Sequence, residues 1–355
     1  MSDVDAQTSG MPPLVAVLPN HRIDDARLFS WLRDTVGITE KLGPIWQFQG
    51  GQSNPTYFVD AGSKPLVIRK KPPGALLASA HAVEREYQVL KALEATDVPV
   101  PRVLSLCEDD SVIGTPFYVM EHVQGRVFAN PALSSAPAEQ RRPIYAQLAQ
   151  TLAALHSVNW RKVGLSGFGR PENFLARQVK RWTQQFSASG LQSEEMVRLS
   201  EWLVAHIPAG DADGSLATLV HGDYRIGNVI LDSARPVIRA VLDWELSTVG
   251  HPFADLAYCC LAWRLPAALR GIRDSDDGQL PSEQEFRAAY LTASGQASLD
   301  GFEYFVAFSL FRQAAILAGV YRRAVEGIAA DARGLEAGDR FQATASIGWQ
   351  TAQKA

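Results

Sequence analysis

The chain has 355 residues, of which 46% are hydrophobic and 20% charged, and its formal net charge is −4. This length allows one large domain or two moderate ones, and the composition is typical of a soluble globular protein. The mildly acidic charge gives none of the basic signature of a nucleic-acid-binding protein.

The cysteine content and the length of the apolar runs indicate in which cellular compartment the protein is expected. Three cysteines, of which Cys259 and Cys260 are adjacent, predict neither a disulfide framework nor a zinc site. The apolar run 253–263 is too short to span a bilayer, and the polar N-terminus MSDVDAQTSG is not a secretory signal. We therefore expect a cytoplasmic protein without a membrane or nucleic-acid partner. The sequence does not specify the oligomeric state.

The N-terminal part of the chain predicts a small sheet interrupted by one helix. Residues 1–20 are expected to form a flexible arm, and Asp24 and Asp25 offer an N-cap to a short helix over 26–36. A helix is predicted to begin at Ser79. Apolar alternation predicts strands over 46–49, 56–59, 65–70, 102–107 and 117–123.

After Gly125 the pattern becomes mainly helical. Apolar periodicity predicts helices over 138–156, 171–186, 194–206, 253–263, 283–294 and 302–325. Short strands are predicted over 218–221, 229–231 and 237–242. The shift in pattern near residue 124 predicts two lobes, residues 21–124 and residues 125–355.

The most informative stretch is His221-Gly222-Asp223-Tyr224-Arg225-Ile226-Gly227-Asn228. Asp223 is followed five positions later by Asn228, and Asp243 ends an apolar strand. A hydroxyl that attacks a γ-phosphate needs a carboxylate to orient it and take its proton, and Mg²⁺ on a polyphosphate needs oxygen ligands. We therefore predict Asp223 as the catalytic base, with Asn228 and Asp243 as Mg²⁺ ligands.

Other polar residues near this motif receive supporting roles. Arg225 is predicted to neutralise the transferring phosphoryl group. His221 and His156 are expected to pack rather than titrate. Glu245 is expected to support the metal ligands, and Asp255 to bond loop backbone rather than metal.

Residues before the motif predict a phosphate-binding turn. Gly50 and Gly51 lie between two expected strands, where backbone without side chains can approach phosphate oxygens closely. Ser53 and Asn54 belong to the same turn. No Gly-Lys-Ser/Thr follows, so the turn is not a Walker loop.

Arg69 is the predicted cation for the α- and β-phosphates. Alternation along the strand places Val67 and Arg69 on one face, toward the nucleotide. Glu86, on the following helix, is expected to face inward and to pair with Arg69, because a buried carboxylate needs a cation. Glu84 is expected to face solvent.

The strand over 118–123 is the predicted adenine-binding segment. The carbonyl of Glu121 and the N–H of Val123 are expected to meet the adenine edge, with Met120 beside them. An ordinary buried strand is the alternative for the same residues.

These residues resemble those of the aminoglycoside phosphotransferase family, small-molecule kinases of the protein-kinase-like fold. The resemblance runs from about residue 25 to 330. It rests on Gly50–Asn54, Val83–Glu86, Val98–Pro101, Val220–Asp223, Asn228 and Leu242–Glu245. It implies an α+β, protein-kinase-like fold, with a small N-terminal antiparallel β lobe and a larger, mainly helical C-terminal lobe. It also implies ATP and Mg²⁺ as cofactors. Arg69 departs from the family, which has Lys there.

A narrower resemblance concerns the acceptor. Residues 66–73, 79–83 and 244–258 resemble the kinase-like domain that animals carry fused to acyl-CoA dehydrogenases, a branch linked to phosphorylation of hydroxyacyl substrates. Asp243 and Asp255 are only twelve positions apart, which leaves little room for a peptide platform. We therefore expect a phosphotransferase that acts on an alcohol group of a small molecule.

The charge of that acceptor is predicted from the C-terminal helices. Arg312 and Arg323 share one helix face at about 100° per residue. Such arginines favour an anionic acceptor, for example a hydroxyacyl thioester. Two alternatives remain. One is an aminoglycoside 3'-type phosphotransferase that confers antibiotic resistance, and the other is a nucleotide-binding pseudokinase scaffold.

Overall fold

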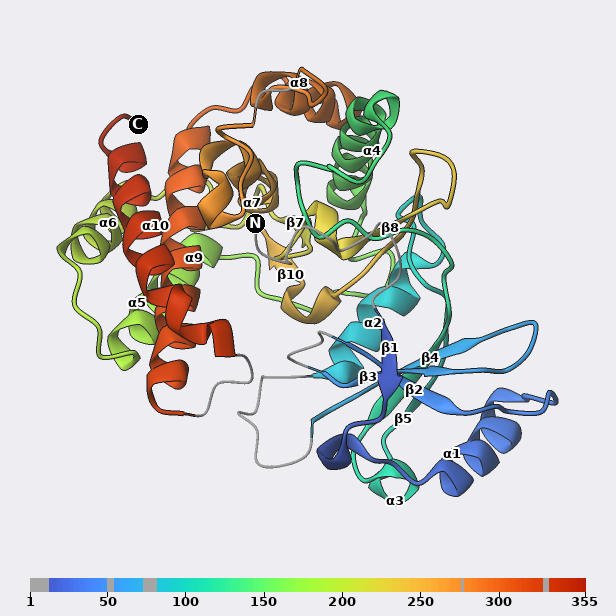
Figure 1. Ribbon diagram of the computed structural model, residues 1–355. Coiled ribbons are helices and arrows are strands. Elements are labelled where there is room, and N and C mark those ends of the chain that lie inside the picture. Colours follow the sequence, from blue (N-terminus) through green and yellow to red (C-terminus); the bar gives the residue numbers. More distant parts are fainter. Residues whose placement is uncertain (1–12, 50–53, 73–81, 276–277, 328–331) are drawn as a thin grey trace. The chain divides into compact units, whose positions relative to one another are not determined.

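The chain forms two compact units, each of which is considered by itself (Figure 1). A computed structural model describes residues 13–49, 54–72, 82–275, 278–327 and 332–355. Unit 1 takes the residues up to Phe128 together with Val163–Leu165 and Asn228–Ser247, and unit 2 takes the remainder. Unit 1 thus also takes three segments of the lobe expected over 125–355, which are residues 125–128, Val163–Leu165 and Asn228–Ser247.

Unit 1 is built on a six-stranded antiparallel sheet with the strand order β1-β2-β3-β4-β6-β5. The strands are β1 (Leu14–Ala16), β2 (Ile45–Phe48), β3 (Thr56–Val59), β4 (Leu66–Lys70), β5 (Val103–Cys107) and β6 (Phe117–Glu121). The helical elements of this part are η1 (Pro19–His21), α1 (Asp25–Trp31), η2 (Leu32–Val36), α2 (Val83–Leu93) and α3 (Asp110–Ile113).

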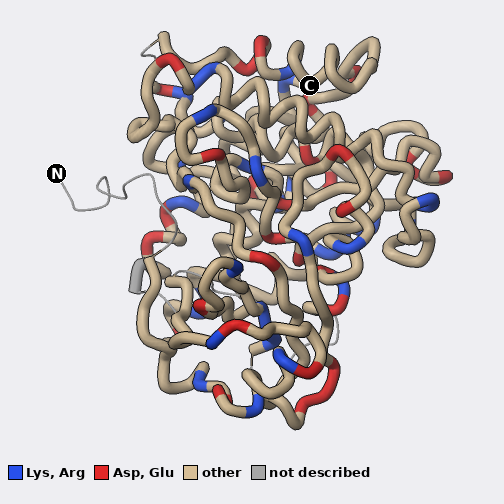
Figure 2. Tube along the Cα trace, turned by 90° about the vertical axis from the view of Figure 1, so that its right-hand side faces the viewer, with Lys and Arg blue, Asp and Glu red and all other residues tan. Residues whose placement is uncertain are grey.

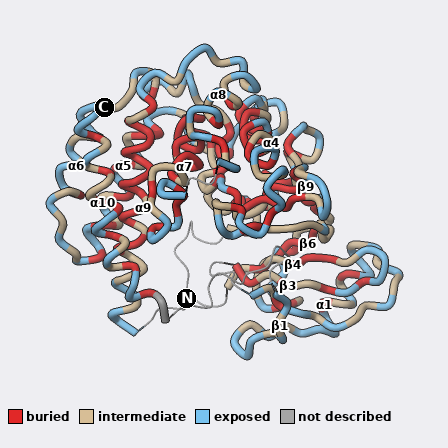
Figure 3. The backbone as a smooth tube through the Cα atoms, turned by 45° about the horizontal axis from the view of Figure 1, so that its top comes forward, coloured by how far each residue is buried: buried red, intermediate tan, exposed pale blue. Residues whose placement is uncertain are grey.

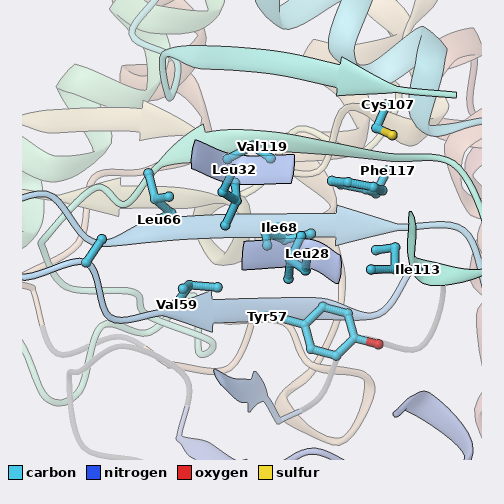
Figure 4. Close-up of a cluster of buried hydrophobic side chains, with 11 residues drawn as sticks. Leu28, Leu32, Tyr57, Val59, Leu66, Ile68, Cys107, Ile113, Phe117 and Val119 are labelled. Atoms are coloured by element: carbon cyan, nitrogen blue, oxygen red, sulfur yellow. The ribbon is translucent and has the colours of Figure 1, made fainter. Parts of the chain in front are cut away.

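Helix α1 covers one face of this sheet. Asp24 caps the helix by accepting a hydrogen bond from the Arg27 N–H, as its position before the apolar stripe predicts. Leu28 and Leu32 are fully buried, and they join the hydrophobic cluster that includes Ile68 (Figure 4). Because side chains alternate along β4, Val67 and Arg69 then lie on the opposite face.

The segment Asn228–Ser247 adds a hairpin to unit 1. Strands β8 (Val229–Leu231) and β9 (Ile238–Val241) pair in antiparallel register, and η4 (Trp244–Leu246) follows. The Val241 N–H donates to the Pro99 carbonyl at 2.8 Å, which ties the hairpin to the loop after α2.

Unit 2 is mainly helical. It contains α4 (Ala138–Ser157), α5 (Phe174–Ala188), α6 (Glu194–Ala205), α7 (Pro252–Arg264), η5 (Ala267–Leu269), α8 (Glu283–Ser294), α9 (Phe302–Val325), η6 (Ala332–Glu336) and α10 (Ala337–Ala352). One small antiparallel sheet joins β7 (Thr218–Val220) to β10 (Thr248–Gly250). The short η3 (Ile226–Asn228) ends where the chain enters unit 1.

Helices α7 and α9 form the centre of unit 2, whereas α6 lies at its surface (Figure 3). Among the described residues α9 alone is long and apolar enough to cross a membrane, and 67% of its apolar stretch is buried inside the fold. Residues of both charge signs are interspersed along the trace (Figure 2).

These observations confirm the predicted α+β class, with an antiparallel sheet in the N-terminal part and helices in the C-terminal part. Some details differ. Leu14–Ala16, expected in a flexible arm, is an edge strand. Helix α2 begins at Val83, after Ala82 with its non-helical angles, and the predicted start at Ser79 lies outside the described residues. Helix α10 and strand β10 were not predicted.

Candidate active site

Arg69 is the centre of a charged cluster in unit 1. Its Nε lies 2.8 Å from Glu86 Oε2, and its Nη2 lies 2.7 Å from Asp243 Oδ1 and 3.7 Å from Glu245 Oε2. The expected ion pair between Arg69 and Glu86 is therefore present. Burial works to lower the pKa of Arg69, but these carboxylates raise it well above its usual value, so the guanidinium stays charged.

Glu86 is held on the sheet face opposite α1. The residue is 1% exposed, and its carboxylate accepts hydrogen bonds from Asn54 Nδ2 at 2.7 Å and Tyr118 Oη at 3.2 Å. Burial raises the pKa of Glu86 and outweighs the opposing effects of Arg69, Asn54 and Tyr118. Glu84, expected in solvent, instead pairs with Lys71 at 2.5 Å.

The hairpin of unit 1 brings Asn228 and Asp243 to adjoining positions. The Leu242 N–H donates to the Asn228 carbonyl at 2.8 Å, so Asp243 directly follows the residue paired with Asn228. Asp243 has a left-handed backbone with φ of 66°, a conformation that Asp tolerates better than most residues. Its side chain is 34% exposed, whereas Asn228 is buried.

The donor atoms of this pair fit a magnesium ion. An amide oxygen and a carboxylate are hard ligands, and Mg²⁺ keeps waters and substrate phosphate oxygens as its remaining ligands. Among the described residues, no group of three His, Cys, Asp or Glu side chains is arranged to hold a metal. Three carboxylates, those of Glu86, Asp243 and Glu245, lie within 4 Å of the one guanidinium of Arg69, so acidic side chains outnumber cations in this cluster.

The other predicted nucleotide-binding residues belong to unit 1 or are not described. Gly50, Gly51 and Ser53 lie outside the described residues. Val67 and Met120 are buried Cα partners on β4 and β6. Strand β6 ends at Glu121, whose side chain pairs with Arg102 at 3.2 Å, and Val123 follows the sheet. Their part in adenine binding stays a prediction.

The loop that carries Asp223 is fixed within unit 2 by a buried carboxylate. Asp255, which is 1% exposed, accepts hydrogen bonds from the backbone N–H of His221 at 2.5 Å and of Gly222 at 2.8 Å. Gly222 has φ of +85°, a backbone conformation in which a residue with a side chain would be strained. Asp255 thus bonds loop backbone, as expected.

Two histidines complete this arrangement. His221 is fully buried, and its Nδ1 accepts a hydrogen bond from the Asp223 N–H at 3.1 Å. His156 lies with Nε2 3.5 Å from Asp255 Oδ2 and Nδ1 2.8 Å from Tyr290 Oη. Burial works to raise the pKa of Asp255, but His156 and the His221 N–H lower it below its usual value. The carboxylate therefore remains ionised.

The Asp223 carboxylate itself meets two further side chains. Arg225 Nε lies 3.5 Å from Asp223 Oδ2, and the Tyr258 hydroxyl donates a hydrogen bond to Asp223. Burial, with the Asp223 charge, raises the pKa of Tyr258, so the phenol keeps its proton as a donor. The arrangement orients a carboxylate that is only partly buried.

Comparison with known proteins identifies the family. Residues 45–302 match a family profile, APH, described as the phosphotransferase enzyme family. The chain belongs to this phosphotransferase family. The kinase-like fold implied by the sequence is thereby confirmed, and it is shared with solved phosphotransferases.

Three relatives illustrate the range of similarity. Acyl-CoA dehydrogenase family member 10 of Mus musculus is 42% identical over 353 residues, which are 97% of this chain and 33% of that protein. The chain thus spans about a third of this curated relative's length.

A crystal structure of a Ralstonia eutropha protein, provisionally described as an aminoglycoside phosphotransferase, has 41% identity. Its TM-score is 0.85, with 94% of this chain and 99% of that chain covered. Spectinomycin phosphotransferase, solved with ADP and spectinomycin, shares the fold alone. Its TM-score is 0.59 at 13% identity, with 94% and 99% covered.

Sequence reasoning missed two hydrogen-bond partners in the candidate site. The hydrogen bond of Tyr258 to Asp223 and the bond of Asn54 to Glu86 join residues more than thirty positions apart. Neither has a local pattern. Tyr258 falls on α7 three positions after Asp255, and this helical spacing is a signal that both residues share a face toward the loop.

Proposed function

We propose that this chain transfers the γ-phosphoryl group of ATP to a hydroxyl of a small molecule, with Mg²⁺ as cofactor. The observation that supports the proposal is the backbone hydrogen bond from Leu242 to Asn228, because Asn228 and Asp243 then occupy adjoining positions of one hairpin. The Asp243 carboxylate already holds a cationic group at 2.7 Å.

Unit 1 supplies the groups for the nucleotide and the metal. Asn228 and Asp243 would hold Mg²⁺, which would neutralise charge on the polyphosphate. Arg69 would contact the α- and β-phosphates while Glu86 keeps hold of its Nε. Gly50, Gly51, Ser53, Asn54, Val67, Met120, Glu121 and Val123 remain the candidates for the other nucleotide contacts.

Unit 2 supplies the base. Asp223 would orient the acceptor hydroxyl and take its proton as the hydroxyl oxygen bonds to the γ-phosphorus. The bond from that phosphorus to the bridging oxygen breaks, and ADP leaves. Arg225, whose side chain is 48% exposed, would offset charge on the transferring group.

The acceptor is proposed to be a hydroxyacyl compound or another anionic alcohol. The similarity to a protein named as an acyl-CoA dehydrogenase family member supports an acyl substrate. The aminoglycoside alternative is supported by the Ralstonia eutropha structure, and a kanamycin-dependent release of ADP would establish it. The one feature that favours a non-catalytic scaffold is Arg69, which stands where the family has Lys.

An ADP-release screen tests this proposal. The wild type is assayed with Mg²⁺ and ATP against hydroxyacyl-CoAs, sugars, amino alcohols and aminoglycosides. Asp223→Asn should keep ATP binding, measured by thermal shift, and lose about 10²–10⁴ in kcat. The matched control is Asp213→Asn, an exposed carboxylate of unit 2. Equal turnover in Asp223→Asn would remove Asp223 from the role, and ATP binding without turnover on the whole panel would favour the scaffold.

A further inference from the structure

A buried arginine lies one aromatic ring away from the proposed base. Arg312 on α9 is 9% exposed, and its guanidinium carbon lies 4.9 Å from the ring centroid of Tyr258 and 5.4 Å from that of Trp182. The hydroxyl of the same Tyr258 bonds Asp223. Arg312, Tyr258 and Asp223 therefore form one continuous series within unit 2.

This guanidinium lacks a direct partner in the described part of the chain. Arg312 Nε is buried and has no hydrogen-bond partner there, and no described carboxylate forms a salt bridge with the guanidinium. Arginine stays protonated in proteins, and a buried charge is costly without a partner. The faces of Trp182 and Tyr258 offset only part of that cost.

A second cation converges on the same place. The guanidinium carbon of Arg181, on α5, lies 5.3 Å from the Trp182 ring. Partial burial and then the charge of Arg312 lower the pKa of Arg181, as expected for two neighbouring cations. A bound anion would relieve this repulsion and supply the missing hydrogen-bond acceptors of Arg312.

We infer that Arg312, assisted by Arg181, binds an anionic group of the phosphoryl acceptor, a carboxylate or a phosphate. This inference rests on the proposed function and deepens it, because it names the acceptor class and a specificity-determining residue. The hydroxyl that Asp223 activates and the anion that Arg312 holds would belong to one molecule, a few bonds apart. A polycationic acceptor would instead meet two guanidinium groups.

A binding experiment tests the anion site without requiring turnover. Wild type, Arg312→Met and Arg322→Met are titrated with inorganic phosphate and with malonate at constant ionic strength, and the melting temperature is followed. Arg322 is the matched control because it is exposed on the same helix and pairs with Glu326. We expect both probes, or one of them, to stabilise wild type and Arg322→Met but not Arg312→Met. An equal response of all three proteins would overturn the inference.

A kinetic experiment tests the link to the acceptor. Hydroxy acids from glycolate to 6-hydroxyhexanoate, their neutral amides, and hydroxyacyl-CoAs are compared as acceptors. Arg312→Met should raise KM for anionic acceptors about 10- to 100-fold, as expected for a charge-assisted hydrogen bond, while KM for the amides and for ATP stays constant. A preference for a hydroxy acid would identify the anion at Arg312 as a carboxylate. A preference for the CoA ester alone would identify it as a phosphate.

The remaining outcomes are also decisive. A rise in KM for ATP would assign Arg312 to the nucleotide and overturn the inference. If Arg312→Met fails to fold, Arg312→Lys is used in its place. This variant retains the charge without the bidentate fork, and its KM for anionic acceptors should rise several-fold. Unchanged KM in that variant counts against the site. If no acceptor is phosphorylated, the proposed function fails while the titration still decides the anion site.

Discussion

Glu86 of unit 1 and Asp255 of unit 2 are equally buried carboxylates with opposite electrostatics. Each is 1% exposed. Glu86 is contacted by the side chains of Arg69, Asn54 and Tyr118, and its pKa is raised. Asp255 is contacted by two backbone N–H groups and His156, and its pKa is lowered.

The difference shows two ways of building a site. Backbone donors cannot turn away, so Asp255 holds the loop of Asp223 in one geometry. Side chains can change rotamer and partner, so the guanidinium of Arg69 is able to exchange its contacts with Glu86 and Asp243 for an anionic ligand. The charges around Glu86 in unit 1 can therefore change partners, whereas the charge of Asp255 in unit 2 serves to hold a loop in place.

The largest expected effect follows from Asp255→Asn. An amide at this position turns at least one N–H donor toward backbone N–H donors and removes the buried charge. We expect a loss of about 3 kcal/mol in the free energy of unfolding, measured by urea denaturation, together with a lower kcat. The exposed variant Asp213→Asn should change neither. A stable and active Asp255→Asn protein would show that the loop is held by other contacts.

The next effect concerns pH and His251, the N-cap of α7. Burial, with the charge of His156, lowers the pKa of His251 to about 4. Its neutral form therefore contributes stability that is present above the unfolded pKa of about 6.5 and is lost as the pH falls toward 4.

His251→Asn removes this titration and retains a capping acceptor for the Phe253 N–H. The slope of unfolding free energy between pH 6.5 and 4 should become shallower by up to about 3 kcal/mol over that range. An unchanged slope would mean that His251 is protonated without penalty.

A smaller effect is expected for Glu86→Gln. Because burial already penalises the charged form of Glu86, its neutral analogue should cost only about 1 kcal/mol in stability. Arg69 loses one of its anchors, so KM for ATP should rise about tenfold. Glu84→Gln, at the half-exposed ion pair with Lys71, is the control. A stability loss equal to that of Asp255→Asn would erase the contrast between the two units.

The smallest effect is expected for Tyr258→Phe. The ring beside Arg312 is retained, and only the hydrogen bond to Asp223 is removed. The value of kcat should fall about 3- to 10-fold with an unchanged KM for the acceptor. A change in KM alone would place the hydroxyl on the acceptor rather than on the base.

Much of the fold could be predicted because many helices and strands show a clear periodicity of apolar residues in the sequence. The helices over 283–294 and 302–325 and the strand over 229–231 have the predicted boundaries. Helix α10 was missed because its buried face is made largely of small residues such as Ala345 and Gly348, which give no apolar stripe. Strands β1 and β10 have three residues each, and they are defined by their partners rather than by their own pattern.

The candidate site divides in the same way. The Asp223 motif and the Arg69–Glu86 pair were visible because a short spacing or an inward helix face predicts each of them. The stacking of Arg312 on Trp182 could not be found, since it depends on how α5 and α9 pack together. For Tyr258, the only sequence signal was its helical spacing from Asp255. Contacts between helices that are distant in the sequence have no short-range sequence pattern from which they could be predicted.

The hairpin Asn228–Ser247 has a consequence for how the protein is made. Although unit 1 begins at the N-terminus, its Asn228 and Asp243 reach the ribosome exit only after about a hundred intervening residues of unit 2. The N-terminal sheet must therefore persist during synthesis without the hairpin that completes it. A fragment ending at Phe128 would lack Asp243, so a gene fusion or truncation has to retain the chain through Ser247 to preserve unit 1.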